Sequence, residues 1–222
     1  MKQIIVALDN MRLEQSVALA NSLWIDGIKE HVWGFKLNHT MIKHVWQFKM
    51  FGNVFVDLKL HDIPTTTSAV LKFLKDINVD MTTIHLSMGS RNLKLIKPFV
   101  KGIEVLGVGV LTSMDILDTL DVFDKSEREI QNRMFEIAIK SNEILDGVVM
   151  SPQDLDLFNK YDPEHKMKRI CPGIRASGIV DDQKRVGTPE MAFAGGADLL
   201  VIGRPITRSA NPVAAVQELL NV

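Results

Sequence analysis

The chain has 222 residues, of which 46% are hydrophobic and 24% charged, and its 26 basic residues nearly balance its 27 acidic ones. These values are typical of a globular protein, which at this length buries about 70–75% of its unfolded surface. The near-neutral charge argues against a nucleic-acid partner. The single cysteine, Cys171, excludes an internal disulfide framework and fits a reducing cytoplasm. The N-terminal apolar run is too short for a signal peptide, and no stretch approaches the roughly 20 apolar residues of a membrane helix.

Short, β-branched apolar runs alternate with longer amphipathic stretches along the whole chain. The expected strands are Gln3–Asp9, Val32–Lys36, Asn53–Lys59, Met81–His85, Gly102–Leu111, Gly147–Met150, Lys168–Cys171 and Asp198–Ile202. Apolar residues recur at helical spacing in Leu13–Trp24, Thr66–Ile77 and Glu127–Leu145. The Asp-rich stretch Ser113–Arg128 predicts a loop and a short helix after the fifth strand.

Three further helix starts are marked by a polar residue followed by proline. Ser151, Thr188 and Asn211 each precede a proline, which is the pattern of an N-cap followed by proline at the first helical position. Together with the periodic stretches, they give about eight strand–helix units. Strands that alternate with helices predict a parallel sheet that is buried on both faces.

Eight such units predict an α/β fold of the (β/α)₈ TIM-barrel type, as a single domain over residues 1–222. An open, doubly wound sheet is the alternative, and it usually carries a glycine-rich turn after the first strand. Here the first strand runs into Asp9-Asn10-Met11, so that marker is missing. We therefore expect the closed barrel, with its site at the carboxyl ends of the strands.

Charged residues gather at several of these strand ends, most densely in the third strand. Side chains alternate across a strand, so Asp57 and Lys59 share one face and point into the barrel mouth. Lys36 ends the neighbouring strand, and Asp62 follows shortly after Lys59. Charges near a packed core are costly unless they are paired, which an alternating row of these four residues achieves. Such a row either closes the barrel structurally or carries chemistry, and we favour chemistry.

The loops after the seventh and eighth strands carry signals for phosphate binding. Barrels often bind phosphate there, through backbone N–H groups and a short helix. Gly173 and Gly203 allow the backbone to approach an anion closely, and Arg204 can contact two phosphate oxygens. Gln183, in the long polar segment 175–187, could cover a ligand from above. This segment is a candidate lid.

A metal site at the mouth is the competing interpretation. Its ligands would be Asp9, Asp57, Asp62 and His85. The positive charges of Lys36 and Lys59 in the same mouth oppose it. We therefore expect neither a metal nor a cofactor.

At these residues the sequence resembles the orotidine 5′-monophosphate decarboxylase family. The central motif is the run from Phe55 to Thr66, FVDLKLHDIPTT. The resemblance covers nearly the whole chain. Its other segments are Val6–Asp9, Phe35-Lys36, Leu111–Met114, Pro172–Arg175, Asp182–Arg185 and Val201–Thr207. The Asp-x-Lys-x-x-Asp core is shared with sugar-phosphate relatives of the same superfamily, and Asp62-Ile63-Pro64 together with Lys36 favour the decarboxylase.

The resemblance implies roles for the residues of the mouth. Asp9 and Lys36 would hold the ribose hydroxyls of orotidine 5′-monophosphate. Asp57 would lie beside the leaving carboxylate, Lys59 would donate a proton to C6, and Thr112 would contact the pyrimidine edge. The phosphate would be bound by Gln183, Gly203 and Arg204, with Arg175 in the same loop.

The resemblance also implies a homodimer with shared sites, in which a second group of residues crosses the interface. These are Asp62, Ile63 and Thr66. The sequence departs from the family pattern at Ala176, Thr65 and Leu86, where proline, asparagine and a small residue are common. None of these departures removes a proposed catalytic group.

Three other functions stay open at the level of sequence. The first is a metal-dependent lyase or epimerase that acts on a pentulose phosphate, in which an acidic residue would suit position 36 better than Lys36. The second is a Schiff-base aldolase that uses Lys59, which requires a lysine with a depressed pKa, whereas flanking carboxylates raise it. The third is a non-catalytic phosphate-binding barrel, which would not need the charged row.

Overall fold

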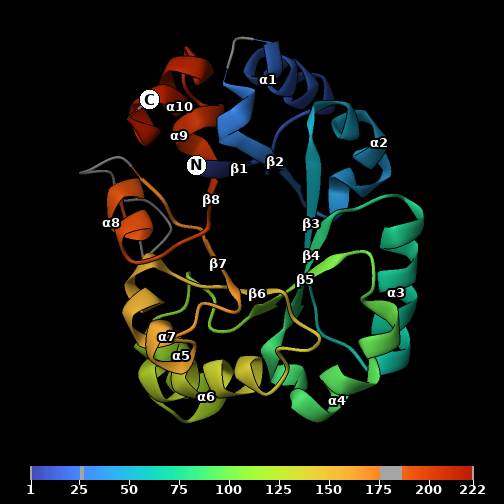
Figure 1. Ribbon diagram of the computed structural model, residues 1–222, viewed down its shortest axis with the longest axis vertical. Helices are drawn as coiled ribbons and strands as arrows, with labels where there is room; N and C mark the ends of the chain where they lie inside the picture. Colours follow the sequence, from blue (N-terminus) through green and yellow to red (C-terminus); the bar gives the residue numbers. More distant parts are fainter. Residues whose placement is uncertain (1, 26–27, 176–186, 222) are drawn as a thin grey trace.

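The chain folds into a closed barrel of eight parallel strands, seen in a computed structural model that describes residues 2–25, 28–175 and 187–221. Each strand pairs with its neighbours in sequence, and β1 pairs with β8 to close the barrel (Figure 1). The strands are β1 (Gln3–Ala7), β2 (Val32–Leu37), β3 (Asn53–Leu60), β4 (Met81–His85), β5 (Glu104–Val108), β6 (Gly147–Val149), β7 (Lys168–Cys171) and β8 (Leu199–Ile202). The expected (β/α)₈ barrel is confirmed, and the open sheet is excluded.

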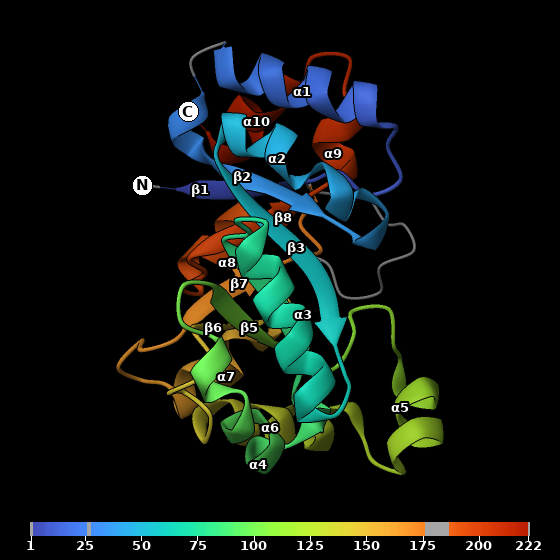
Figure 2. The same ribbon diagram turned by 90° about the vertical axis from the view of Figure 1, so that its right-hand side faces the viewer.

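Helices surround the barrel, and Figure 2 shows α5 standing apart from the helices that cover it. They are α1 (Leu13–Ile25), α2 (Val45–Phe48), α3 (Pro64–Asp76), α4 (Ser90–Leu95), α5 (Ile116–Phe123), α6 (Glu127–Ile139), α7 (Leu155–Tyr161), α8 (Pro189–Ala194), α9 (Arg204–Thr207) and α10 (Pro212–Leu220). Short 3₁₀ turns lie between several of them, including Leu86–Met88 after β4. Within the described ranges, no helix is both long and apolar enough to cross a membrane.

The strands are buried on both faces, as a parallel barrel requires. Along β1, Ile4 and Val6 belong to the large outer core between strands and helices, whereas Ile5 and Ala7 belong to a smaller core inside the barrel. The other inner-core residues are Phe55, Met81, Leu106, Ile170, Leu199 and Val201. This apolar plug fills the barrel below its carboxyl end, so polar chemistry is confined to the mouth.

The expected helix starts are confirmed by their hydrogen bonds. The side chains of Ser151, Thr188 and Asn211 each accept the backbone N–H of a residue two or three positions further on. The Asp-rich stretch forms the short helix α5, which begins with a reciprocal capping box between Asp115 and Asp118. Local side-chain chemistry therefore sets where these elements begin.

Two elements are at least five residues shorter than their apolar patterns predict, and β1 ends at Ala7, two residues before the expected Asp9. The fifth strand ends at Val108 because its last residues bend into the mouth instead of pairing with β6. Helix α6 ends at Ile139, and the chain then turns, with the N–H of Ile144 bonded to the carbonyl of Ser141. Ile144 and Leu145 are buried by this turn. Their apolar character reflects packing and not a continued helix.

Three aspartates tie the strands together at the amino end of the barrel. Asp80, Asp146 and Asp198 directly precede β4, β6 and β8, and each accepts the N–H of the second residue of the preceding strand, at 2.7, 2.8 and 2.7 Å. Charge-assisted bonds of this kind are stronger than neutral ones. This end of the barrel is therefore built for stability, and the carboxyl end is left for function.

Candidate active site

A cavity of 970 Å³ opens at the carboxyl end of the barrel. It is lined by most of the residues that the sequence places at the strand ends. These are Asp9, Lys36, Asp57, Lys59, Thr112, Arg175, Gly203 and Arg204. Barrel closure brings them together from β2, β3 and the loops after β1, β5, β7 and β8. Gln183 and Ala176, and most of the expected lid, lie outside the described residues.

Four of the lining residues form a continuous row of alternating charge. The Nζ of Lys36 donates to both carboxylate oxygens of Asp9, at 2.8 and 2.7 Å, and lies 3.6 Å from Oδ2 of Asp57. The Nζ of Lys59 donates to the same Oδ2 at 2.8 Å. The row therefore runs Asp9–Lys36–Asp57–Lys59. Lys36 and Asp57 are its buried centre, with side chains 11% and 13% exposed.

Asp57 is held ionised by its neighbours. Burial acts to raise its pKa, but the charges of Lys36 and Lys59, together with hydrogen bonds from Lys59 and Thr83, outweigh burial and hold the pKa below its ordinary value. The hydroxyl of Thr83 donates to Oδ1 at 2.7 Å. Sequence reasoning missed Thr83, although it lies two positions before His85 and therefore on the same inward face of β4.

Lys59 has an unusual backbone conformation for a lysine. Its φ is +47°, in the left-handed region that non-glycine residues seldom occupy, and the pairing of β3 with β4 shifts register at this point. The Oγ1 of Thr83 accepts the backbone N–H of Lys59 at 2.8 Å. Thr83 therefore holds both members of the Asp57–Lys59 pair. Strained residues that are fixed by their surroundings are common at functional sites.

The residues His61–Ile63, which follow shortly after Lys59, are exposed and do not line the cavity. Among the described residues, no ion pair joins Asp62 to the row, and Asp62 Oδ1 accepts the N–H of Ile63 at 2.6 Å. Ile63 is 63% exposed, and Thr66 lies exposed in the first turn of α3. Within one chain, the charged row therefore includes Asp9 and does not include the expected Asp62.

The other side of the mouth is built for close backbone approach. Gly173 has a φ of +75°, which a residue with a side chain rarely adopts. Gly203 directly precedes the short helix α9, and its carbonyl accepts the N–H groups of Ile206 and Thr207. Arg175 is 6% exposed, and its guanidinium donates to the carbonyl of Ile174 at 2.8 Å. Two buried or half-buried arginines, Arg175 and Arg204, thus border this side.

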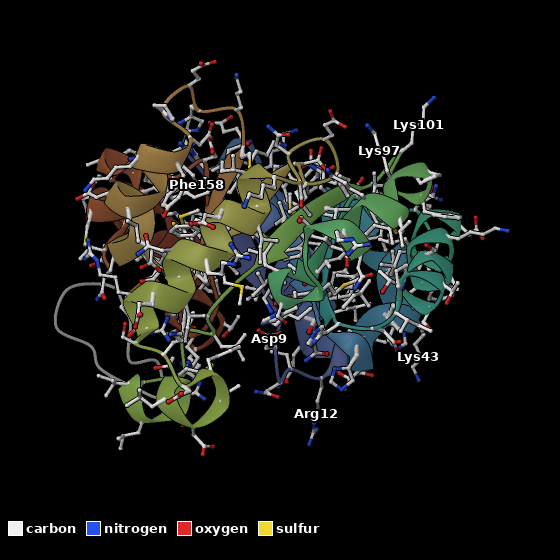
Figure 3. The ribbon with its side chains drawn as sticks, turned by 90° about the horizontal axis from the view of Figure 1, so that it is seen from below. Asp9, Arg12, Lys43, Lys97, Lys101 and Phe158 are labelled. Carbon is white, nitrogen blue, oxygen red and sulfur yellow. The ribbon has the colours of Figure 1, made fainter. Side chains whose placement is uncertain are left out.

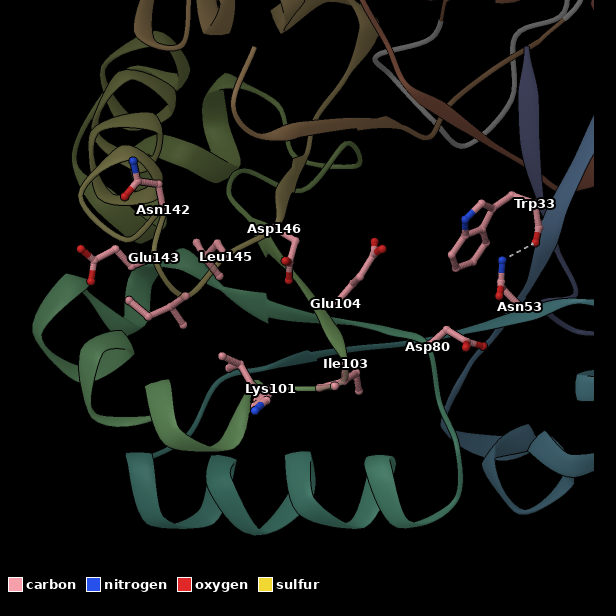
Figure 4. Close-up of a pocket in the computed structure, with 13 residues that line it drawn as sticks. Trp33, Asn53, Asp80, Lys101, Ile103, Glu104, Asn142, Glu143, Leu145 and Asp146 are labelled. Atoms are coloured by element: carbon pink, nitrogen blue, oxygen red, sulfur yellow. Dashed lines mark hydrogen bonds between the residues drawn. The ribbon is translucent and has the colours of Figure 1, made fainter. Parts of the chain in front are cut away.

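A second hollow, of 500 Å³, opens at the amino end of the barrel (Figure 4). Four carboxylates line it, and each is already engaged. Asp80 pairs with Lys49, Glu104 pairs with Lys168, Glu143 pairs with Lys97, and Asp146 binds a strand N–H. Nowhere in the described ranges do three or more His, Cys, Asp or Glu side chains lie close enough together to hold a metal ion.

Comparison with known proteins identifies the family of this chain. The sequence profile of the orotidine 5′-phosphate decarboxylase / HUMPS family matches residues 2–219. The chain is 34% identical over 231 aligned residues to the orotidine 5′-phosphate decarboxylase of Wolbachia pipientis, an alignment that covers 99% of this chain and 98% of the relative. It is 39% identical over 174 residues to the one from Mannheimia succiniciproducens, with 75% and 73% coverage.

Solved structures show the same fold. Orotidine 5′-phosphate decarboxylase from Lactobacillus acidophilus aligns with a TM-score of 0.80 at 25% identity, covering 100% of this chain and 98% of that one. The enzyme from Pyrococcus horikoshii aligns with a TM-score of 0.77 at 23% identity, covering 99% and 98%, which supports the fold alone. From its sequence profile, its relatives and its barrel, the chain belongs to the orotidine 5′-phosphate decarboxylase / HUMPS family.

Proposed function

We propose that this chain is a carboxy-lyase that converts orotidine 5′-monophosphate to uridine 5′-monophosphate in pyrimidine biosynthesis. Its curated relatives carry the name orotidine 5′-phosphate decarboxylase over nearly the whole chain. The observation that carries the proposal is the Lys59–Asp57 contact of 2.8 Å at the mouth. An ammonium group is thereby held next to a carboxylate in a cavity large enough for a nucleotide.

Lys59 is the group that we assign to the chemical step. Loss of carbon dioxide leaves a carbanion at C6 with little delocalisation, so negative charge must be stabilised as it develops. An ammonium that is fixed in advance stabilises this charge and then donates its proton. Asp57 fixes Lys59, and in this proposal it faces the leaving carboxylate. We invoke no cofactor for this step.

The remaining residues of the mouth bind the rest of the substrate in this proposal. Asp9 and Lys36 hold the ribose hydroxyls. Their carboxylate and ammonium groups, which lie 2.7 Å apart, can accept from and donate to hydroxyl groups. Thr112 contacts the pyrimidine edge. The phosphate is bound by Arg204, Gly203, Arg175 and Gln183. Binding of a remote dianion supplies energy that the enzyme can use to exclude water from the reacting end.

We further propose that the enzyme works as a cytoplasmic homodimer with shared sites. Asp62, Ile63 and Thr66 would then complete the site of the second subunit. Two features support this. Asp62 is unattached to the row of its own chain, and Ile63 exposes a large apolar side chain next to it. Contact with a second copy would bury the side chain of Ile63 and bring Asp62 to the site of that copy.

The decisive experiment follows the ultraviolet absorbance of orotidine 5′-monophosphate in the presence of a chelator. We expect the absorbance to fall when the purified chain is added, and to stay constant with Lys59→Ala. A fall that the chelator abolishes would indicate the metal-dependent alternative. A constant absorbance with the unaltered chain, with or without chelator, would reject the proposed reaction.

A further inference from the structure

Beside the charged row lies a hydrogen-bonded chain of three side chains that the proposed reaction does not use. The Nε2 of His61 lies 3.1 Å from the hydroxyl oxygen of Ser87, and that oxygen lies 2.6 Å from Nδ1 of His85. The two imidazole rings stack, with centroids 5.2 Å apart and planes 29° apart. The cluster links the end of β3 to the turn after β4.

The direction of these bonds follows from one backbone contact. The N–H of Ser87 also donates to Nδ1 of His85, at 3.2 Å, so Nδ1 is an acceptor and carries no proton. The proton of the neutral His85 ring is then on Nε2. The Ser87 hydroxyl must donate to His85, and it can therefore only accept from His61. All three side chains have one fixed arrangement.

Burial and the nearby His61 and Lys59 lower the pKa of His85, with burial the largest cause. His85 is therefore neutral at neutral pH, as the acceptor role of its Nδ1 requires. The arrangement is thus the resting state of the cluster under physiological conditions.

The three residues lie outside the cavity of their own chain, so they are not placed to touch a substrate bound there. What they hold is the turn that begins at His61, and the next residue is Asp62. A separate tie, from Thr83, already holds Asp57 and Lys59. The hydrogen bonds of Thr83 thus hold the segment before Leu60, and the hydrogen bond from His61 to Ser87 holds the segment after it.

We propose that His61, Ser87 and His85 position Asp62 for the site of a second copy of this chain. This inference rests on the proposed shared site and adds to it. These are positioning residues, which act through Asp62. Their substitution in one subunit impairs the site of the other subunit and leaves the site of their own subunit intact.

A mixed dimer separates the two subunits' contributions. Chains with Lys59→Ala and with Asp62→Ala are co-expressed with different affinity tags, and the hybrid is isolated by two purification steps. It holds one intact site, made from Lys59 of the Asp62→Ala chain and Asp62 of the Lys59→Ala chain. Ser87→Ala is then added to one chain or to the other. The control is Ser90→Ala in α4, whose side chain makes no hydrogen bond within the described structure.

We expect Ser87→Ala in the chain that supplies Asp62 to lower kcat/KM about 10- to 100-fold, since small misplacements have effects of this size. When Ser87→Ala is placed in the chain that supplies Lys59, kcat/KM should change by no more than about twofold. We expect the control Ser90→Ala to have an equally small effect in either chain. Equal losses in both placements, a loss only in the Lys59-supplying chain, or no loss would each overturn the positioning role. An inactive parent hybrid would reject the shared site, and the positioning role with it.

A second pair of variants tests the hydrogen bond itself. In the chain that supplies Asp62, His61→Gln keeps an N–H donor at about the position of Nε2, whereas His61→Leu removes it. We expect the Gln variant of the hybrid to be at least about fivefold more active than the Leu variant, a difference within the range for one positioning contact. Equal activity of the two variants would show that the donor is not what positions Asp62.

Discussion

The Nζ of Lys59 lies 2.8 Å from Oδ2 of Asp57, and the backbone that carries this lysine is left-handed, with a φ of +47°. Thr83 fixes both residues, through the carboxylate of Asp57 and the N–H of Lys59. The ammonium group is therefore placed by a strained backbone and a tight ion pair before any substrate arrives. This preorganisation is what the proposed reaction, through an unstabilised carbanion, requires.

Replacement of Lys59 tests the assignment of the proton donor. Lys59→Ala removes both the positive charge and the proton, and we expect kcat/KM to fall at least about 10⁴-fold. Lys59→Arg keeps the charge but gives up a proton far less readily, so part of the loss should remain. Lys43→Ala, at an exposed lysine that points away from the barrel (Figure 3), is the control. Near-normal turnover by Lys59→Ala, measured by absorbance, would refute the role.

Replacement of Arg204 tests the phosphate side of the mouth. We expect Arg204→Ala to lower kcat/KM for orotidine 5′-monophosphate by about 10²-fold or more, because a charge-assisted contact to the dianion is lost. The unphosphorylated nucleoside should lose little. Arg12→Ala is the matched control, since Figure 3 shows Arg12 pointing away from the body of the protein. Equal losses for the two substrates would place the phosphate elsewhere.

The lowered pKa of Asp57 makes part of the folding stability depend on pH. Its folded pKa lies below the ordinary value of 3.8, so the unfolded chain binds the proton more readily. This contribution is complete above the ordinary value and is lost as the pH falls through the folded pKa. We expect Asp57→Asn, measured by urea unfolding from neutral to acidic pH, to lose stability less steeply than the unaltered chain in acid. Equal slopes would contradict the ionised state of Asp57.

Arg169, a buried arginine outside the candidate active site, is expected to contribute to the stability of the fold. Arg169 is 1% exposed and lies 3.3 Å from the carboxylate of Asp162. Its guanidinium also donates to Asn159 and to the carbonyls of Asp162 and Met167, and it lies over the ring of Phe158. Every part of the planar group is thus engaged between β7 and α7.

We expect Arg169→Met to lower the free energy of unfolding by about 3 kcal/mol or more, because Asp162 loses its buried ion-pair partner. Arg133→Ala is the control, since its pair with Glu136 lies at the surface and should change stability by less than about 1 kcal/mol. Chemical denaturation of both variants measures the difference. A small effect at Arg169 would mean that the surrounding bonds rearrange to replace it.

The sequence by itself determined the strand–helix alternation, and with it the barrel, because side-chain periodicity and N-caps act locally. It also identified most of the mouth, since the carboxyl ends of parallel strands meet at one end. Alternation along β3 placed Asp57 and Lys59 on one face without any tertiary information.

Only the tertiary structure decided which charges meet. Asp9, in the turn after β1, ends the charged row, whereas Asp62, which is close to Lys59 in sequence, lies outside the cavity of its own chain. The left-handed backbone of Lys59, the ties from Thr83 and the His61–Ser87–His85 chain all depend on how β4 lies against the end of β3. These contacts depend on strand register and barrel closure, which are set by the packing of the whole chain and not by any local pattern of residues.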